Sequence, residues 1–518
     1  MTRMLIGRDY EGVPCIKITK GTLDPINTPD GNTGAFLYNS KWAYQIRLHG
    51  IERNGYFGSS FNWPAGASNA DFQRRVWQQP SAPGSNHHYY RASYFQGLGY
   101  QLPLFDVLPR RLNGNGYFKS GRIWTTFHGH ESRGERVTTV EPATGWAGPE
   151  FGWKLNHAVE MEGQTITYGD LLGFSDYYTE DTSEMYRWQG HDLVIWNLPG
   201  DESGISDAQP GGLLSGQPSI RLSKDGLRVA KPGYNVDQAF GTQLAFDSNM
   251  RPIKIIAADD IAIPSGDSSY QLPFAVPADT VCDAQFYTGG TLYYPAMPRQ
   301  TPLGADWLVS GDRIYFSNPG EACRGRFMVM AFDRTPQTSG DNEVYRKFNV
   351  NGEDVFQFVR PGAGNPPSFA DIVIDSRWPS LRLLSQGYFG VAEGAQQTQI
   401  PIDTTGFYPI IKYMTVHGGY GGRANDGAYG YSKMVKPPLT AMFWLRAPNG
   451  GVGWTNAGDS SYAAVSADRV TFFTFRGAPM RATFASQNAL NNGQITFTYP
   501  SSPVIGIRYY IFGIPKKD

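Results

Sequence analysis

The sequence predicts an all-β protein with very little helix, built from three tandem β-sandwich-like modules (jelly-roll or immunoglobulin-like) that carry loop insertions. Three observations predict it: abundant turn residues, alternation of apolar and polar residues in short segments, and a set of short sequence motifs, here called phrases, that recurs three times in the same order. The 518 residues include 61 Gly and 36 Pro, which favours many turns over long helices. Aromatic residues, 14% of the chain, suit the half-buried surfaces of sheets.

Internal repetition is the strongest of these signals. A basic residue followed by Pro-Gly occurs at 231–233 and 360–362, and Lys-Gly at 20–21 is a looser copy. Each is followed by an apolar segment that ends in Asp-Ser or Asn-Ser, at 244–248, 372–376 and 36–40. Homologous modules explain several phrases in one order better than chance similarity among β-rich segments does.

Further phrases follow in each copy. A Gln-aliphatic-Pro step occurs at 101–103, 271–273 and 399–401, and in the second and third copies its Gln stands 23 positions after the Ser. A turn-and-strand phrase occupies 309–316 and 465–472, with a shorter version at 120–124. Apolar segments at 191–196, 327–332 and 509–512 are predicted to be the closing strands.

These anchors define the expected organisation. The first module covers residues 1–203, with insertions at about 50–98 and 128–190; the second covers 219–335; the third covers 345–518, with an insertion at about 418–460. Segments rich in Gly, Pro, Ser and Asp, at 201–217 and 335–342, are predicted linkers. A constant scaffold with variable loops is a common way to build a binding surface.

The elements follow from local patterns. Alternation of apolar and polar residues predicts strands at 16–18, 45–48, 227–229, 252–255 and 380–383. The Pro-Gly steps supply the positive φ of a tight turn, and Asp or Asn before Ser can end a strand by bonding to the backbone. The best predicted helix is 68–77, with Ser68 or Asn69 as its cap and Phe72 and Val76 one turn apart.

Charge and hydropathy exclude several functions. Charged residues make up only 18% of the chain, the net charge is −1 and the pI is about 6.7, so nothing favours nucleic acid as a partner. No apolar run is long enough to span a bilayer, and residues 1–8 lack the apolar core of a secretion signal. We therefore expect synthesis in the cytoplasm and no membrane insertion.

The three cysteines, Cys15, Cys282 and Cys323, make a poor disulfide framework. Cys282 and Cys323 lie in one repeat and could be neighbours, but reduced, buried thiols are the preferred interpretation.

Two histidine phrases are candidate ligand sites. His128, His130 and Glu131 form the most metal-like phrase, because residues two apart on a strand share a face, but no third-ligand spacing accompanies them. The phrase at 87–90, His-His-Tyr-Tyr, could contact a polar ligand or a subunit, although burial of the rings is the simpler interpretation.

Other candidate residues are acids, a serine loop and tryptophans. A carboxylate pair for glycoside hydrolysis could come from an acidic group in the first module, but a solvated loop is the preferred interpretation. That group comprises Asp170, Asp176, Glu180, Asp181 and Glu184.

The loop at 200–204 superficially resembles a serine-nucleophile loop, but Glu202 breaks the pattern. Trp63, Trp77, Trp153 and Trp454 could stack on sugars, although Trp in a β protein is more often core. We assign no catalytic, cofactor-binding or metal-binding residue.

The phrase at 227–236, leading into 244–248, resembles the opening of small β modules in structural proteins of tailed bacteriophages. In those modules a basic-Pro-Gly turn precedes a strand that ends in Asp-Ser. The match is close over about 25 residues, less close in the third copy and loosest in the first, which has no Pro after Lys20 and has Asn39 for Asp. The resemblance implies a virion component of the tail or tail tip, whose modules dock on other virion proteins or face the host.

The expected function is therefore that of a non-catalytic structural protein of the tail tip, baseplate or fibre region. Its expected partners are other virion proteins and copies of itself in a symmetric assembly, with a host glycan or receptor as a further contact. The alternative is a carbohydrate-binding, adhesin-like protein that recognises a surface glycan. A third hypothesis is a polysaccharide depolymerase that uses acids of the first module, such as Asp176 or Glu180.

Overall fold

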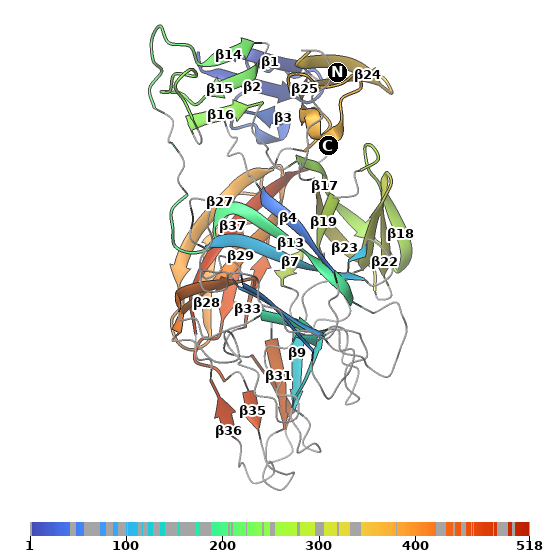
Figure 1. Cartoon of the computed structure of the whole chain (residues 1–518), viewed down its shortest axis with the longest axis vertical. Coiled ribbons are helices and arrows are strands. Elements are labelled where there is room, and N and C mark those ends of the chain that lie inside the picture. Colours follow the sequence, from blue (N-terminus) through green and yellow to red (C-terminus); the bar gives the residue numbers. More distant parts are fainter. Residues whose placement is uncertain are drawn as a thin grey trace.

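The computed structural model of the chain consists mainly of antiparallel β-strands (Figure 1). It describes the chain from residue 3 to 516 with gaps, the longest of which are 56–72, 79–85, 92–99, 128–134, 140–153, 156–171, 176–187, 296–304, 332–342, 421–430 and 484–495. Among the described residues, the helical elements are short 3-10 turns such as η1 (Thr33–Ala35) and η5 (Phe369–Asp371). The predicted all-β class with very little helix is confirmed.

The repeated phrases form three antiparallel sheets of three strands each. They comprise β1 (Arg3–Arg8), β2 (Pro14–Thr19) and β3 (Phe36–Asn39); β14 (Ile220–Ser223), β15 (Gly226–Ala230) and β16 (Leu244–Asp247); and β24 (Tyr345–Val350), β25 (Glu353–Val359) and β26 (Ile372–Asp375). The three sheets lie together at the top of Figure 1, and we call them the cap.

The three cap sheets have the same register. The middle strand pairs with the last strand, and a β-bulge interrupts the pairing after the equivalent residue in each sheet. The equivalent pairs before the bulge are Ile18–Tyr38, Val229–Phe246 and Phe358–Ile374. The first copy, loosest in sequence, thus forms the same sheet as the other two.

The serine that ends each phrase makes the same two hydrogen bonds in all three sheets. Its Oγ accepts from a backbone N–H of the middle strand, and its own N–H donates to the carbonyl of that residue. The pairs are Ser40 with Ile16, Ser248 with Leu227 and Ser376 with Phe356, with N–Oγ distances of 2.9, 3.0 and 3.0 Å. Each sheet turns apolar residues into one shared cluster, whose buried members are Ile16, Ile18, Leu227, Val229, Ala245, Phe246, Phe358, Val373 and Ile374.

Beneath the cap, each repeat contributes three long strands in one order, with the closing strand in the middle. The sets are β4 (Leu48–Gly55), β13 (Trp188–Pro199) and β7 (Pro103–Arg111); β17 (Lys254–Ile263), β23 (Cys323–Ala331) and β19 (Thr280–Thr288); and β27 (Arg382–Gly390), β37 (Val504–Pro515) and β29 (Phe407–Tyr420). The predicted closing strands fall in β13, β23 and β37. We call these three sets the body.

The repeats exchange strands. From the second repeat, β18 (Gly266–Gln271), β22 (Arg313–Asn318) and β21 (Asp306–Ser310) join the sheet of the first repeat through β8 (Gly116–Tyr117). From the third repeat, β28 (Gln396–Pro401), β34 (Arg469–Thr474) and β33 (Ser461–Val465) join the sheet of the second through β20 (Thr291–Tyr294). The third repeat's long strands form a sheet with β30 (Tyr431–Lys436). The repeats therefore share sheets across the module limits predicted from the sequence.

The predicted insertions of the first and third modules meet at the opposite end from the cap (Figure 1). There β9 (Ile123–Phe127), which lies just before the first module's predicted insertion at 128–190, pairs in parallel with β31 (Ala441–Arg446) of the third module's insertion. The two strands are flanked by β10 (Glu135–Thr139) and β32 (Val452–Asn456). A separate sheet contains β5 (Gln73–Gln78), β6 (Asn86–Arg91), β11 (Lys154–Leu155) and β12 (Leu172–Ser175), and β35 (Arg481–Thr483) pairs with β36 (Thr496–Thr498).

No strand lies in the described residues between Pro199 and Ile220, which agrees with the linker predicted there. The linker predicted at 335–342 lies outside the described residues.

Two sequence predictions are wrong. The predicted helix at 68–77 is a strand over Gln73–Gln78, because pairing with β6 outweighs its helix-like spacing; residues 68–72 lie outside the described residues. The Gln-aliphatic-Pro phrases are not equivalent either: Gln271 pairs with Arg313, whereas Pro401 pairs with Arg469. The phrase of the third repeat is therefore displaced by two residues relative to that of the second. Because side chains alternate between the two faces of a strand, a displacement of two leaves each side chain on its face, and the alternation of apolar and polar residues does not reveal it.

Candidate functional site

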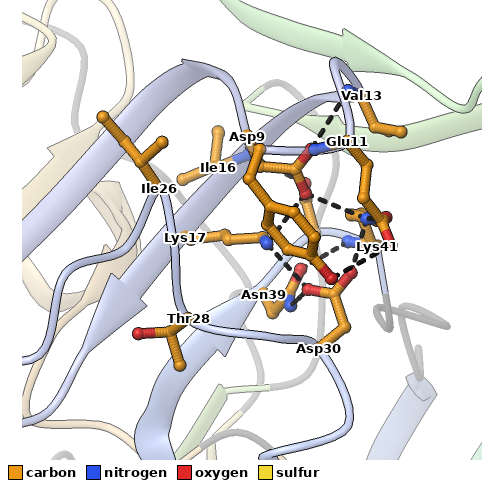
Figure 2. A network of polar contacts seen from close by, with 12 residues as sticks. Asp9, Glu11, Val13, Ile16, Lys17, Ile26, Thr28, Asp30, Asn39 and Lys41 are labelled. Atoms are coloured by element: carbon orange, nitrogen blue, oxygen red, sulfur yellow. Dashed lines mark hydrogen bonds and ion pairs between the residues drawn. The ribbon is translucent and has the colours of Figure 1, made fainter.

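The first candidate is a cluster of charged residues in the cap, drawn in Figure 2. Asp9, Glu11 and Asp30 offer carboxylate oxygens within 4.8 Å of one another, the one group of three potential metal ligands found among the described residues. The ammonium of Lys17 lies 2.8 Å from both Asp9 and Asp30, and that of Lys41 lies 2.9 Å from Asp9. Lys41 also contacts Glu11 and Asp30. The two ammonium groups thus occupy the space in which a metal ion would neutralise the acids.

The cluster is held as ion pairs. Burial alone would raise the pKa of Asp9, but hydrogen bonds from Lys17 and Lys41 lower it to about 2. Burial opposes the charge of Lys41 as well, yet its three carboxylate partners raise its pKa above the usual value. Asp9 and Asp30, whose pKa values are both lowered, therefore stay ionised at neutral pH and remain bound to the lysines.

The other repeats have a related contact at the same position. Lys17, Arg228 and Gln357 occupy equivalent places in the middle strands of the cap sheets. Arg228 Nε lies 3.2 Å from Asp247 Oδ2, and Gln357 Nε2 donates to Asp375 Oδ2 at 2.6 Å. In the second and third repeats this side chain contacts the acid opposite it in the last strand of the sheet, and in the first repeat Lys17 contacts acids of the adjacent loops. Because each contact joins parts of the cap, we interpret the cluster as structural.

The second candidate lies where the three repeats meet in the body. Asp106 on β7, Asp283 on β19 and Lys412 on β29 come from the equivalent strand of each repeat. Lys412 Nζ lies 3.1 Å from Asp106 Oδ1 and 2.6 Å from Asp283 Oδ2. All three side chains are buried, with residue exposures of 5%, 3% and 0%. We call them the axial triad.

Apolar and aromatic side chains enclose the axial triad. Trp196 Nε1 donates to Asp106 Oδ2 at 2.7 Å, and the ring centre of Tyr294 lies 5.5 Å from Lys412 Nζ. The same strands place buried apolar residues two positions from the triad: Leu104, Leu108, Val281, Ile410 and Met414. Beside it, Gln285 Nε2 donates to the carbonyl of Ile411 at 2.9 Å, which links the second repeat to the third.

Burial sets the protonation of the axial triad. It raises the pKa of Asp106, and the nearby ammonium of Lys412 offsets this only in part. It would lower the pKa of Lys412, but attraction to Asp106 and Asp283 raises that pKa above the usual value. The raised pKa favours the neutral form of Asp106, which reduces the net charge of this buried cluster, as a low-dielectric interior favours.

Two arginines extend these links between repeats. Arg326 and Arg508 occupy equivalent places on β23 and β37. Arg326 Nε lies 2.7 Å from the buried Asp260, and its guanidinium also donates to the carbonyl of Pro409 in the third repeat. Arg508 Nε donates to the hydroxyl of Tyr510, which donates to the carbonyl of Pro199 in the first repeat at 2.7 Å.

Many residues singled out in the sequence lie outside the described residues. They are His128, His130, Glu131, Asp170, Asp176, Glu180, Asp181, Glu184, Trp63 and Trp153. The phrase at 87–90 lies on β6, where His87 pairs with Trp77 of β5. Trp454 lies on β32 and pairs with Trp444 of β31.

The remaining candidates are structural. In the loop at 200–204, the N–H of Gly200 donates to the carbonyl of Leu102, and the N–H of Ser203 donates to Asp201 Oδ1. Cys15, Cys282 and Cys323 are free and buried, as the preferred interpretation held. Burial raises the pKa of the Cys15 thiol to about 11.

Sequence reasoning missed the axial triad. Each member is a single charged residue within an apolar or aromatic run, at 103–108, 281–284 and 409–414. A lone charged residue in an apolar segment can be found in the sequence. That the three residues meet follows only from the structure, in which β7, β19 and β29 hold the same place in their repeats.

Comparisons with protein-family models, with curated proteins and with solved structures found no match to this chain. Within the described residues, no helix has the length and apolar character needed to cross a membrane.

Proposed function

We propose that this chain is a structural component of a tailed-phage virion, in the tail tip, baseplate or fibre region, where it mediates subunit assembly. The proposal rests on the resemblance of the repeated phrase at 227–248 to small modules of such proteins. It also rests on the architecture, because a cap of three equivalent sheets suits attachment to a symmetric assembly.

The observation that carries the proposal is the equivalence of the cap sheets. Ser40, Ser248 and Ser376 make the same bonds, and their sheets share one core. One chain thus offers three similar surfaces around a common centre, as a homotrimer would. Such a surface can engage several partner subunits at once, which raises weak contacts to useful avidity.

Electron microscopy of purified phage particles labelled with antibody against this chain tests the proposal. We expect label at one defined place on the tail. An antibody against a major capsid protein is the control for particle integrity. Intact particles that contain the capsid protein but none of this chain would contradict the proposal.

A carbohydrate-binding role is the second candidate, favoured by a strand register that sets aromatic residues opposite one another in the predicted insertions. Trp444 pairs with Trp454, and Trp77 pairs with His87, in strands contributed by the predicted insertions. Aromatic rings are common platforms for sugars. Binding of the full chain on a glycan array, lost after Trp444→Ala and Trp454→Ala but kept after Phe348→Ala in the cap, would support this role. The absence of binding to any glycan would count against it.

A further inference from the structure

We propose that the axial triad is a site of self-modification, in which Lys412 Nζ and the carboxyl group of Asp283 condense to an isopeptide bond. The bond would join β29 of the third repeat to β19 of the second. This proposal is independent of the biological role proposed above, since it concerns chemistry inside the folded chain.

The geometry favours the condensation. Nζ of Lys412 lies 2.6 Å from Asp283 Oδ2, with both atoms on rigid strands in the centre of the body. Holding a nucleophile against its electrophile in this way replaces a bimolecular encounter by an intramolecular step. Both atoms are inaccessible to solvent, so water cannot compete with the amine.

The third member supplies the proton relay that the reaction needs. Asp106 Oδ1 lies 3.1 Å from Nζ, and its other oxygen accepts from Trp196, which fixes the orientation of the carboxyl group. Burial raises the pKa of Asp106, which favours its protonated form and so suits it to pass a proton between the two reacting groups. Asp283 is the closer of the two acids to Nζ, so we assign it as the electrophile.

The proposed step balances without an external reagent. A proton passes from the ammonium of Lys412 to the Asp283 carboxylate, which leaves a neutral amine beside a carboxylic acid. The lone pair of Nζ forms a bond with Cγ of Asp283, and Asp106 protonates the departing oxygen while it accepts a proton from the nitrogen. The Cγ–O bond breaks and one water molecule leaves. Asp106 ends protonated as it began, and no oxidant or reductant takes part.

The charged cluster of the cap provides an internal comparison. Lys17 is also buried and contacts two aspartates, each at 2.8 Å. There, however, a second ammonium, that of Lys41, keeps the acids ionised, and the pKa of Asp9 is lowered to about 2. Because the pKa values of both Asp9 and Asp30 are lowered, neither carboxylate readily takes the proton of Lys17; the amine stays charged and is not a nucleophile, so we expect no bond at Lys17.

The mass of the full chain, measured after denaturation, tests the proposal. We expect it to be lower than the sequence mass by one water molecule. Trypsin should then fail to cleave after Lys412, and the peptide 383–423 should appear joined to the peptide 255–299. Fragmentation should place the link between Lys412 and Asp283. A cyclised aspartate, which also loses water, would leave the two peptides separate and would overturn the proposal.

Three variants test the roles of Lys412 as the nucleophile and Asp106 as the proton relay. Lys412→Met should restore the full sequence mass, whereas Lys17→Met, the matched control, should keep the mass deficit. Asp106→Asn should restore the full mass in a protein that still unfolds cooperatively, because it removes the proton relay but keeps the side-chain shape. A wild-type chain that has the full sequence mass, with 383–412 and 413–423 as separate peptides, would refute the proposal whatever the variants do.

Discussion

A serine hydroxyl closes each cap sheet. Ser40, Ser248 and Ser376 are buried, and each accepts a hydrogen bond from the middle strand of its sheet. A Ser→Ala substitution removes the acceptor and leaves a buried backbone N–H without it, at a cost of about 1–2 kcal/mol. The repeated Asp-Ser phrase thus has a physical cause in the way each strand ends.

We expect Ser40→Ala, Ser248→Ala and Ser376→Ala each to lower the free energy of unfolding by about 1–2 kcal/mol. Urea unfolding followed by fluorescence measures the change. Ser265→Ala, at an exposed turn, is the control and should have little effect. If only one or two of the three substitutions destabilise the protein, the hydrogen bonds are not equivalent in strength.

The cluster around Asp9 gives the cap a defined pH dependence. Its folded pKa of about 2 lies below the usual value of 3.8, so the carboxylate stabilises the folded state above about pH 4 and this contribution is lost as the pH falls toward 2. The contribution of this one group is about 2 kcal/mol.

Asp9→Asn should therefore lower the free energy of unfolding at neutral pH and flatten its decline between about pH 4 and pH 2. Urea unfolding of the variant and the wild type across this range measures both effects. Asp267→Asn, which changes an exposed acid, should leave the curve near that of the wild type. Parallel curves for Asp9→Asn and the wild type would contradict the prediction.

The turn after β15 connects an element of the cap to the predicted linker at 201–217. Gly233 has a φ of +89°, and a Cβ there would lie 2.7 Å from the Cα of Gly211. The N–H of Gly211 donates to the carbonyl of Pro232 at 2.7 Å, so the linker is fastened to this turn. Gly21, in the same turn of the first repeat, has a φ of +54° but open space around it.

Gly233→Ala should thus destabilise the protein more than Gly21→Ala. Both variants strain a left-handed residue at a cost of about 1 kcal/mol, and only Gly233→Ala also forces two backbones apart. Urea unfolding of the two variants gives the comparison directly. Equal losses would mean that the linker moves away from the turn without cost.

The sequence was sufficient for elements whose cause is local. The strand at 227–229 follows from alternation, and the turn at 231–233 follows from Pro and Gly. The sequence was not sufficient where pairing with another strand decides the secondary structure. Residues 73–78 have a helix-like spacing of apolar residues, but they form a strand because they pair with β6. The axial triad was out of reach for the same reason, because Asp106 and Lys412 are 306 positions apart and meet only where the long strands β7 and β29 pack together.

The molecule as a whole is held together by contacts between repeats. The β20–β33 pairing joins the second repeat to the third, and the β8–β21 pairing joins the first to the second. Lys412 contacts acids of both other repeats, and Arg326 reaches the carbonyl of Pro409. Each repeat therefore depends on its neighbours to complete its sheets and to neutralise its buried charges.

Residues 219–335 should consequently fail to fold alone, although the sequence predicts them as one module. Removed from the chain, β20 and β21 become unpaired edges, the cap sheet loses its share of the common core, and Asp283 loses its cation. A homotrimer of this segment would bring three Asp283 carboxylates together, which is unfavourable without a counter-charge. Thermal unfolding followed by circular dichroism should show no cooperative transition for the segment, while the full chain should show one. A monomeric segment that melts cooperatively would show that the exchanged strands are dispensable.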